Sequence, residues 1–132
     1  MHIQKILVTM MVIVLITTAC TPTKGLNETS WILTALDNKP VVNDTLVTIK
    51  FEKGMTTGGD GCNSYSTTFI QKGHKITISP NIASTMMACP EAIMQQAATY
   101  TTMLTQVATY KIDDQQLALL DANGKTLATF TK

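Results

Sequence analysis

The sequence predicts an α+β fold, in which a strongly curved antiparallel β-sheet or open barrel of about seven or eight strands packs against one helix. Three observations lead to this prediction. Short segments alternate apolar and polar residues, as half-buried strands do, and residues 45–51 are the clearest case. Clusters of Gly, Asn, Asp and Pro separate these segments. Only residues 90–108 carry apolar side chains at convincing helical spacing.

The expected strands follow one another with short connections. Residues 37–40 are interpreted as a turn, and so are the glycine-rich residues 55–61. Asn123 and Gly124 predict a type I′ hairpin turn, because both central positions of that turn need positive φ. The strands are expected at residues 31–36, 45–51, 62–70, 75–79, 82–88, 109–112, 116–120 and 126–130.

The helix is expected over residues 90–108. Pro90 suits the first helical position, and Glu91 suits the positive end of the helix dipole. One face of this segment is apolar along its length and is expected to pack against the sheet. That face consists of Ile93, Ala97, Tyr100, Leu104 and Val107.

Residues 1–19 have the organisation of a secretory signal peptide. Lys5 gives a basic start, residues 6–16 are almost entirely apolar, and Ala19 is the small residue before a cleavage site. The apolar stretch is shorter than the ~20 residues that a membrane-spanning helix needs. Cys20 follows directly, which resembles the lipobox of bacterial lipoproteins, whose cysteine thiol receives a diacylglyceryl group before the signal is removed.

The lipobox resemblance implies that Cys20 anchors the protein to a membrane. Thr17 departs from the lipobox, which usually has an aliphatic residue there, and an ordinary signal peptide cut near Ala19 is the alternative. Residues 20–30 contain one large apolar side chain and are expected to form a flexible tether. Thr21, not Asp, follows the cysteine, so in a host with two membranes lipoprotein sorting favours the outer membrane, facing the periplasm.

The composition indicates one exported domain. Cleavage leaves 132 − 19 = 113 residues, which suit one domain. Loss of Lys5 reduces ten basic residues to nine, against nine acidic ones, so the formal charge is zero. The chain has no Arg and no basic patch, so nucleic acid is not an expected partner. The membrane and an envelope protein are the expected partners, and the sequence leaves the oligomeric state open.

Two cysteines remain once Cys20 is assigned to the lipid. Cys62 and Cys89 are an even pair in an oxidising compartment, which predicts a disulfide. On the chain-entropy model, a bridge across 89 − 62 = 27 positions stabilises the fold by roughly 3–4 kcal/mol. Two buried thiols are the alternative.

Several short motifs occur in one order along the chain. They are Trp31-x-Leu33, Gly61-Cys62-Asn63-x-Tyr65, Ser84-Thr-Met-Met-Ala-Cys-Pro90, Tyr110-x-Ile112 and Leu117-x-Leu119. This order resembles the META domain family, which includes the bacterial heat-shock protein HslJ, over residues 28–132, and we place the domain itself at residues 31–132.

The resemblance implies a small α+β fold, frequent export as a lipoprotein, and no established enzymatic activity. It also implies a link to stress tolerance, including novobiocin resistance, and in some relatives to virulence and motility. The chain departs from the family at residues 95–97, where Gln-Gln-Ala stands in place of a helix glutamate that many members carry. A role that depends on that carboxylate is therefore not carried over.

Three groups of residues suggest chemistry, and each has a plainer interpretation. The glycines of residues 58–61 suggest an anion cradle, but no Lys-Ser or Lys-Thr follows them, so a turn leading into a strand is favoured. A catalytic thiol needs His74, the one histidine of the mature chain, and a third orienting group. Met86, Met87 and Cys89 suggest copper binding, yet methionine commonly fills cores and a disulfide removes the thiolate. No catalytic residue, cofactor or metal is therefore predicted.

Asn63 and Tyr65 are the candidate recognition surface. They lie two positions apart in an extended segment, so they share a face, next to the predicted disulfide. The alternative is that Asn63 caps the glycine turn and Tyr65 packs in the core. The expected function is a non-enzymatic envelope lipoprotein that binds a partner in stress tolerance. A periplasmic inhibitor of a hydrolase such as lysozyme and a copper-handling lipoprotein are the alternatives.

Overall fold

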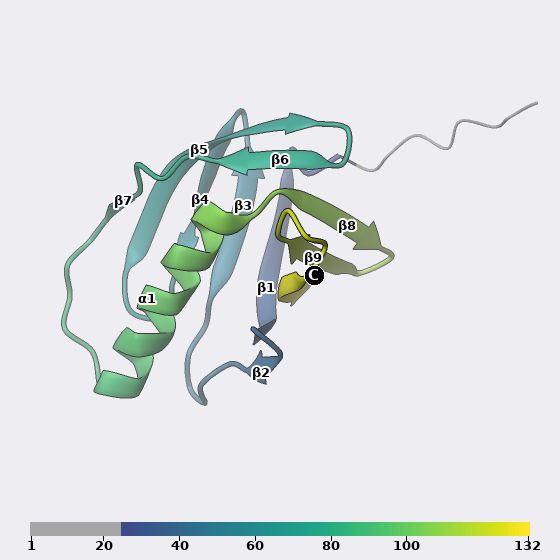
Figure 1. Ribbon diagram of the computed structural model, residues 1–132. Coiled ribbons are helices and arrows are strands. Elements are labelled where there is room, and N and C mark those ends of the chain that lie inside the picture. The colour runs from purple at the N-terminus through teal and green to yellow at the C-terminus, as the bar shows by residue number, and fades with distance from the viewer. Residues whose placement is uncertain (1–24) are drawn as a thin grey trace, which may run out of the picture.

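The computed structural model describes residues 25–132, so the signal peptide, Cys20 and the first part of the tether lie outside the described residues. In this part the chain forms ten strands and one helix, which confirms the predicted α+β class (Figure 1). No helix within residues 25–132 is both long and apolar enough to span a membrane. The elements are β1 (Thr29–Leu36), β2 (Lys39–Pro40), β3 (Thr48–Glu52), β4 (Met55–Gly59), β5 (Ser64–Lys72), β6 (Lys75–Ile78), β7 (Ala83–Ser84), α1 (Glu91–Gln106), β8 (Thr109–Asp113), β9 (Gln116–Leu120) and β10 (Thr126–Thr131).

All strands belong to one antiparallel sheet that curves back on itself. Its order is β10-β9-β8-β6-β5-β4-β3-β1-β2, and β10 also pairs with β1. The contact between β6 and β8 is slight, because only Lys75 and Thr109 pair there. β7 lies off this path and pairs with the first part of β5. The strongly curved sheet that the sequence predicts is therefore present, with ten strands in place of seven or eight.

The two strands that the sequence analysis misses are β2 and β4, both in segments interpreted as turns. β4 contains two glycines, and glycine is depleted in strands because it has no side chain to pack. Gly58 is nevertheless required here, because a Cβ built on it would lie 2.0 Å from the carbonyl oxygen of Thr48. The glycine thus lets β4 approach β3 closely, and the anion cradle considered for residues 58–61 is wrong, since Gly58 and Gly59 pair with β5.

The hairpin turns differ from the prediction. Between β3 and β4, Lys53 and Gly54 both have positive φ, 50° and 77°, as a type I′ turn requires. The hairpin predicted at Asn123 and Gly124 is confirmed, since β9 and β10 pair antiparallel, but only Gly124 has positive φ, so the type I′ turn is wrong. The connection between β9 and β10 is a longer loop, in which Asp121 Oδ1 accepts hydrogen bonds from the amides of Asn123 and Lys125, each at 2.9 Å.

The ordered domain begins earlier than residue 31. Leu26 is fully buried, and its amide donates a hydrogen bond to Gln71 Oε1 at 3.1 Å. β1 then begins at Thr29. The tether expected over residues 20–30 is therefore wrong for its described part, because a single large apolar side chain in a polar segment is enough to fix that segment to the core.

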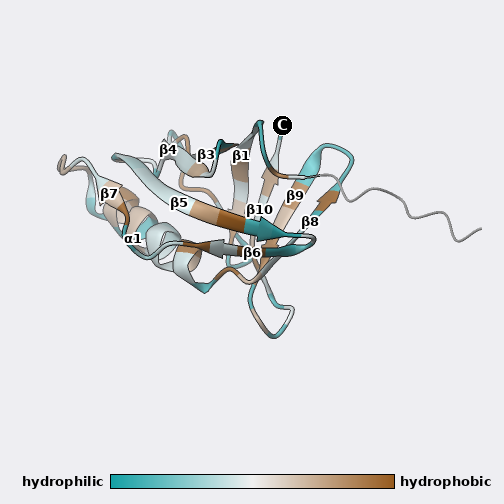
Figure 2. Cartoon of the chain, turned by 90° about the horizontal axis from the view of Figure 1, so that it is seen from above, coloured by the Kyte–Doolittle hydropathy of each residue, from teal (hydrophilic) through white to brown (hydrophobic). Residues whose placement is uncertain are grey.

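The core lies between the sheet and α1, and strands rich in apolar residues surround it (Figure 2). α1 begins after Pro90, which takes the N-cap position where the sequence predicted the first helical position. Ala97, Tyr100 and Leu104 are buried as predicted. The largest side chains with almost no exposure are Trp31, Tyr100, Tyr110, Phe51 and Phe130. The helix therefore lies with its apolar face against the sheet, as its periodicity predicts.

Candidate functional site

A disulfide joins Cys62 and Cys89, which confirms the predicted pair. The Cα atoms are 5.9 Å apart, within the usual bridging range. Cys62 lies in the turn before β5, and Cys89 lies just before α1. The bridge therefore ties the connection between β7 and α1 to the start of β5. Because both thiols are bonded, neither is available as a nucleophile or as a thiolate ligand for copper.

Asp60 organises the turn between β4 and β5. Its side-chain oxygen Oδ1 accepts hydrogen bonds from the amides of Cys62 at 2.9 Å and Asn63 at 2.6 Å. Its own amide donates to the carbonyl of Asn63 at 2.9 Å. Gly61 supplies the positive φ of 96° that this turn needs. Aspartate next to glycine is a turn signal in the sequence, but nothing there shows that only 4% of Asp60 is exposed.

Asn63 is partly exposed, and its side chain holds a neighbouring segment in place. Its side-chain oxygen Oδ1 accepts hydrogen bonds from the Thr85 hydroxyl at 3.0 Å and from the Met87 amide at 2.7 Å. The Thr85 hydroxyl also accepts a bond from the amide of Ser64. Asn63 thus holds the segment after β7 against the start of β5, alongside the disulfide.

Tyr65 does not belong to a recognition surface, so this part of the prediction is wrong. It is 3% exposed, and its hydroxyl lies 3.0 Å from the Thr48 carbonyl and 2.8 Å from the hydroxyl of Tyr100. Burial raises the pKa of both phenols above the ordinary tyrosine value, and the negative charge of Asp60 raises them further. The alternative interpretation, in which Tyr65 packs in the core, is the one that the structure shows.

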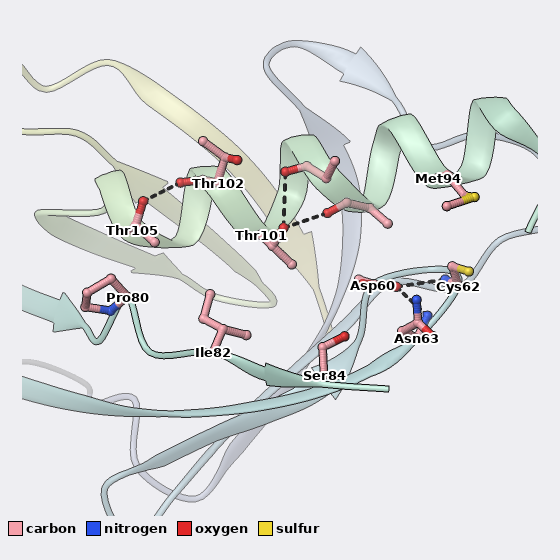
Figure 3. Close-up of a pocket in the computed structure, with 12 residues that line it drawn as sticks. Asp60, Cys62, Asn63, Pro80, Ile82, Ser84, Met94, Thr101, Thr102 and Thr105 are labelled. Atoms are coloured by element: carbon pink, nitrogen blue, oxygen red, sulfur yellow. Dashed lines mark hydrogen bonds between the residues drawn. The ribbon is translucent and has the colours of Figure 1, made fainter. Parts of the chain in front are cut away.

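A groove runs between α1 and the β5–β7 side of the sheet (Figure 3). Its volume is about 450 Å³. One end holds Asp60, Cys62 and Asn63, and Met94 lines the helix side. The rest of the wall is formed by Pro80, Ile82, Ser84, Ala97, Ala98, Thr101, Thr102 and Thr105. A groove of this size with few polar groups at one end has the general form of a small-ligand site.

Three exposed methionines lie on the segments on either side of Cys89, Met86 and Met87 before it and Met94 in the first turn of α1, and we refer to them as the methionine patch. Met86 is 97% exposed, Met87 is 60% exposed and Met94 is 46% exposed. Met87 is bonded to Asn63 through its amide, and Met94 lies across the groove from Cys62 (Figure 3). Sequence analysis interpreted Met86 and Met87 as core filler, but the segment that carries them protrudes.

Gln96 is a second buried polar residue that the sequence analysis did not assign to a role. It is 9% exposed. Its Oε1 accepts a hydrogen bond from the Val42 amide at 2.7 Å, and its Nε2 donates to the Thr45 hydroxyl at 3.1 Å. Gln96 therefore fixes the loop between β2 and β3 to α1, in the part of the helix where many family members carry glutamate.

The remaining candidates do not assemble a catalytic or metal-binding centre within residues 25–132. His74 is exposed in the turn between β5 and β6, and its ring lies 6.0 Å from that of Tyr110. No three His, Cys, Asp or Glu side chains of the described chain are grouped as metal ligands. The features that stand out are therefore the groove, its buried carboxylate and the methionine patch.

Comparisons with known proteins agree with this fold. The chain is similar to a protein from Burkholderia xenovorans solved by NMR, with 24% identity, 81% of this chain and 83% of that chain covered, and a TM-score of 0.67. It is also similar to a DUF4847 family protein from Bacteroides vulgatus, with 16% identity, 80% and 93% covered, and a TM-score of 0.58. These likenesses show the fold alone. No curated protein sequence matches the chain. The META domain family matches residues 24–132, which include every described residue, and the protein therefore belongs to the META domain family.

Proposed function

We propose that this protein is a non-enzymatic binding protein of the bacterial cell envelope, anchored through a lipid on Cys20. Its META domain acts in stress or antibiotic tolerance of the novobiocin type by docking on another envelope protein. The observation that carries the binding role is the methionine patch. Exposed apolar side chains that cluster are typical of interaction sites, and methionine adapts to partner surfaces because it is flexible and polarizable.

The methionine patch is held in place before any partner arrives. The disulfide fixes Cys89, which follows the two protruding methionines in the chain. Asn63 fixes Thr85, which precedes them, and the backbone of Met87 itself. A surface that is already ordered loses less conformational entropy on binding. This arrangement supports a docking role better than a role as a mobile linker.

Genetic complementation tests the proposed role. Deletion of the gene is expected to increase sensitivity to novobiocin, heat or detergent, and the wild-type gene is expected to restore tolerance. The double variant Met86→Asp/Met87→Asp should fail to restore it, because charges oppose apolar docking. Met55→Asp is the matched control, since Met55 is 41% exposed but lies at the β3–β4 turn, away from the patch. Unchanged sensitivity after deletion would contradict the stress role.

Photo-crosslinking in cells tests the docking surface itself. A crosslinking amino acid at position 86 is expected to give a discrete product with an envelope protein. The same residue at position 70 should not, although Ile70 is 64% exposed. Ile70 lies seven positions beyond Asn63 (70 − 63 = 7), which is about 23 Å of extended chain and separates the two sites. Equal products from both positions would argue against a specific surface.

The lipid anchor has its own test. We expect the mature N-terminal peptide from the membrane fraction to begin at Cys20 and to carry acyl chains in mass spectrometry. Cys20→Ser should release the protein from the membrane fraction, because stable anchoring needs about two acyl chains. An unmodified Cys20 in membrane-associated protein would contradict this part of the proposal.

Inhibition of a periplasmic hydrolase is a second candidate, and the protrusion of Met86 favours it. A rigid segment with a 97% exposed apolar side chain suits insertion into an enzyme cleft. The full chain, expressed with Cys20→Ser, should then slow lysozyme, and Met86→Asp should relieve the inhibition. Absence of inhibition across a set of muralytic enzymes would remove this candidate and leave the docking proposal in place.

A further inference from the structure

The groove holds a negative charge that the described chain does not balance. Asp60 is the one buried charged residue among residues 25–132. Oδ1 accepts two amide hydrogen bonds, and Asp60 forms no ion pair within this part of the chain. Oδ2 is not a buried atom that lacks a partner, so it remains accessible where Asp60 lines the groove. A buried carboxylate held by neutral amides alone is costly, and a nearby cation would offset that cost.

The surroundings of Asp60 exclude an anionic ligand and favour a cationic one. Figure 3 shows Asp60 next to Cys62 and Asn63, at one end of the groove. No lysine lines the groove, and the chain contains no arginine. A cation that enters the groove would therefore meet an unpaired carboxylate and no competing positive charge.

The rest of the groove is long, and most of its hydroxyl groups are bonded within the protein, with Thr102 the exception among the helix residues. Its helix side extends from Met94 to Thr105, which is about 16 Å at 1.5 Å per residue. The hydroxyl of Thr101 donates to helix carbonyls, as does that of Thr105, so both are satisfied within α1. Ile82 and Ala98 supply apolar wall. Such a wall matches an aliphatic chain better than a sugar or a nucleotide, whose hydroxyls need partners.

We propose that this groove binds an aliphatic primary amine, with the ammonium group at Asp60 and the aliphatic chain along α1. The volume of about 450 Å³ lies within the roughly 300–1,000 Å³ that is usual for small-ligand sites. The ammonium donates to Oδ2, which completes the hydrogen bonding of the carboxylate, and the chain displaces water from Ile82 and Ala98. Met94 belongs both to this groove and to the methionine patch. The amine is proposed to bind at Asp60, whereas the docking tests change Met86 and Met87, so the two proposals can fail separately.

Hexylammonium and 1-hexanol test the proposal, because they share an aliphatic chain and differ in charge. The full chain is expressed with Cys20→Ser and titrated with each compound while amide chemical shifts are recorded. Hexylammonium should shift the amides of Ala97, Ala98 and Thr101. Its dissociation constant should be lower than that of 1-hexanol by a factor of about ten or more.

Asp60→Asn should abolish the preference for hexylammonium, because asparagine keeps the Oδ1 acceptor but not the charge. Asp121→Asn is the matched control, since Asp121 Oδ1 accepts two amide bonds in a turn outside the groove. This control should keep the wild-type preference. Equal affinity for the two compounds, or unchanged preference in Asp60→Asn, would overturn the proposal.

A second variant covers the case in which Asp60→Asn does not fold. Ala98 is exposed on the helix wall of the groove, and Ala98→Leu should fill part of the volume and weaken hexylammonium binding at least about fivefold while Asp60 stays in place. If Ala98→Leu binds as well as the wild type, or if the shifted amides lie outside the groove, the groove is not the amine site. The complementation test with Met86→Asp/Met87→Asp measures the docking role and does not depend on amine binding, so failure of one proposal can be told from failure of the other.

Discussion

The phenol oxygens of Tyr65 and Tyr100 lie 2.8 Å apart, and the hydroxyl of Tyr65 donates to the carbonyl of Thr48. Their rings meet edge to face, with centroids 5.7 Å apart. One residue comes from β5, one from α1 and one from β3. This contact therefore fixes the helix to the sheet.

The tyrosine pair predicts a loss of stability at alkaline pH. Burial raises the folded-state pKa of both phenols above the ordinary value of 10.0. The unfolded chain releases these protons near pH 10 while the folded chain retains them. The stabilisation that each buried phenol contributes is therefore complete below pH 10. Above that pH the free energy of unfolding falls by about 1.4 kcal/mol per pH unit for each phenol. Urea unfolding between pH 8 and pH 11.5 measures this slope.

The double variant Tyr65→Phe/Tyr100→Phe is the control for that slope. It should be less stable than the wild type at pH 8, because the hydrogen bond to Thr48 is lost, yet its stability should decline less above pH 10. Tyr110→Phe should keep most of the steep decline, since the paired phenols remain. Parallel pH profiles for the wild type and the double variant would show that these phenols do not cause the decline.

Removal of the disulfide should destabilise the domain without changing its fold. For Cys62→Ala/Cys89→Ala, the chain-entropy model with a sequence separation of 27 gives a loss of about 3–4 kcal/mol in the free energy of unfolding. Urea unfolding measures this loss. The Met87 amide should exchange its hydrogen faster in this variant. Its acceptor, Asn63, lies on a segment that the disulfide no longer ties to Cys89, so their hydrogen bond should open more often. Wild-type protection at Met87 would mean that Asn63 alone holds the segment.

Gly58→Ala should be strongly destabilising, whereas Gly59→Ala should not. A Cβ at position 58 would lie 2.0 Å from the Thr48 carbonyl oxygen and 3.0 Å from the Tyr65 hydroxyl, so β3 and β4 must separate. The nearest atom to a Cβ at position 59 is 3.7 Å away, which is an ordinary contact. We expect a loss of about 3 kcal/mol or more for Gly58→Ala and less than about 1 kcal/mol for Gly59→Ala, by thermal unfolding. Similar losses at both positions would contradict the close approach.

The sequence predicts most of the fold because its patterns are local. Alternation identifies β3 and β6, and helical spacing identifies α1 within two residues at each end. β4 is missed because the reason for Gly58 is the carbonyl of Thr48, ten positions earlier in the chain (58 − 48 = 10), and no local pattern shows that approach.

The candidate site was only partly predictable, for a related reason. Tyr65 lies on the same side of β5 as Phe69, so its alternation with a core residue already favoured burial over exposure. Asp60 can be predicted only as a turn former, because its burial depends on the tertiary fold and not on a local pattern. For Met86 and Met87 the plainer interpretation is core filling, because methionine is usually buried, but both side chains are exposed.

Gln96→Ala should destabilise the protein, and the neighbouring Gln95→Ala provides the comparison. The first change leaves the Val42 amide without its acceptor and the Thr45 hydroxyl without its donor. An unsatisfied buried donor costs about 1–3 kcal/mol. Gln95 is exposed and donates only to Glu91 within the helix, so its loss should cost about 0.5 kcal/mol or less. Urea unfolding gives both values, and amide exchange at Val42 should accelerate in Gln96→Ala alone. Equal losses for the two variants would mean that the loop between β2 and β3 is held by other contacts, and that Gln96 is not what fixes it to α1.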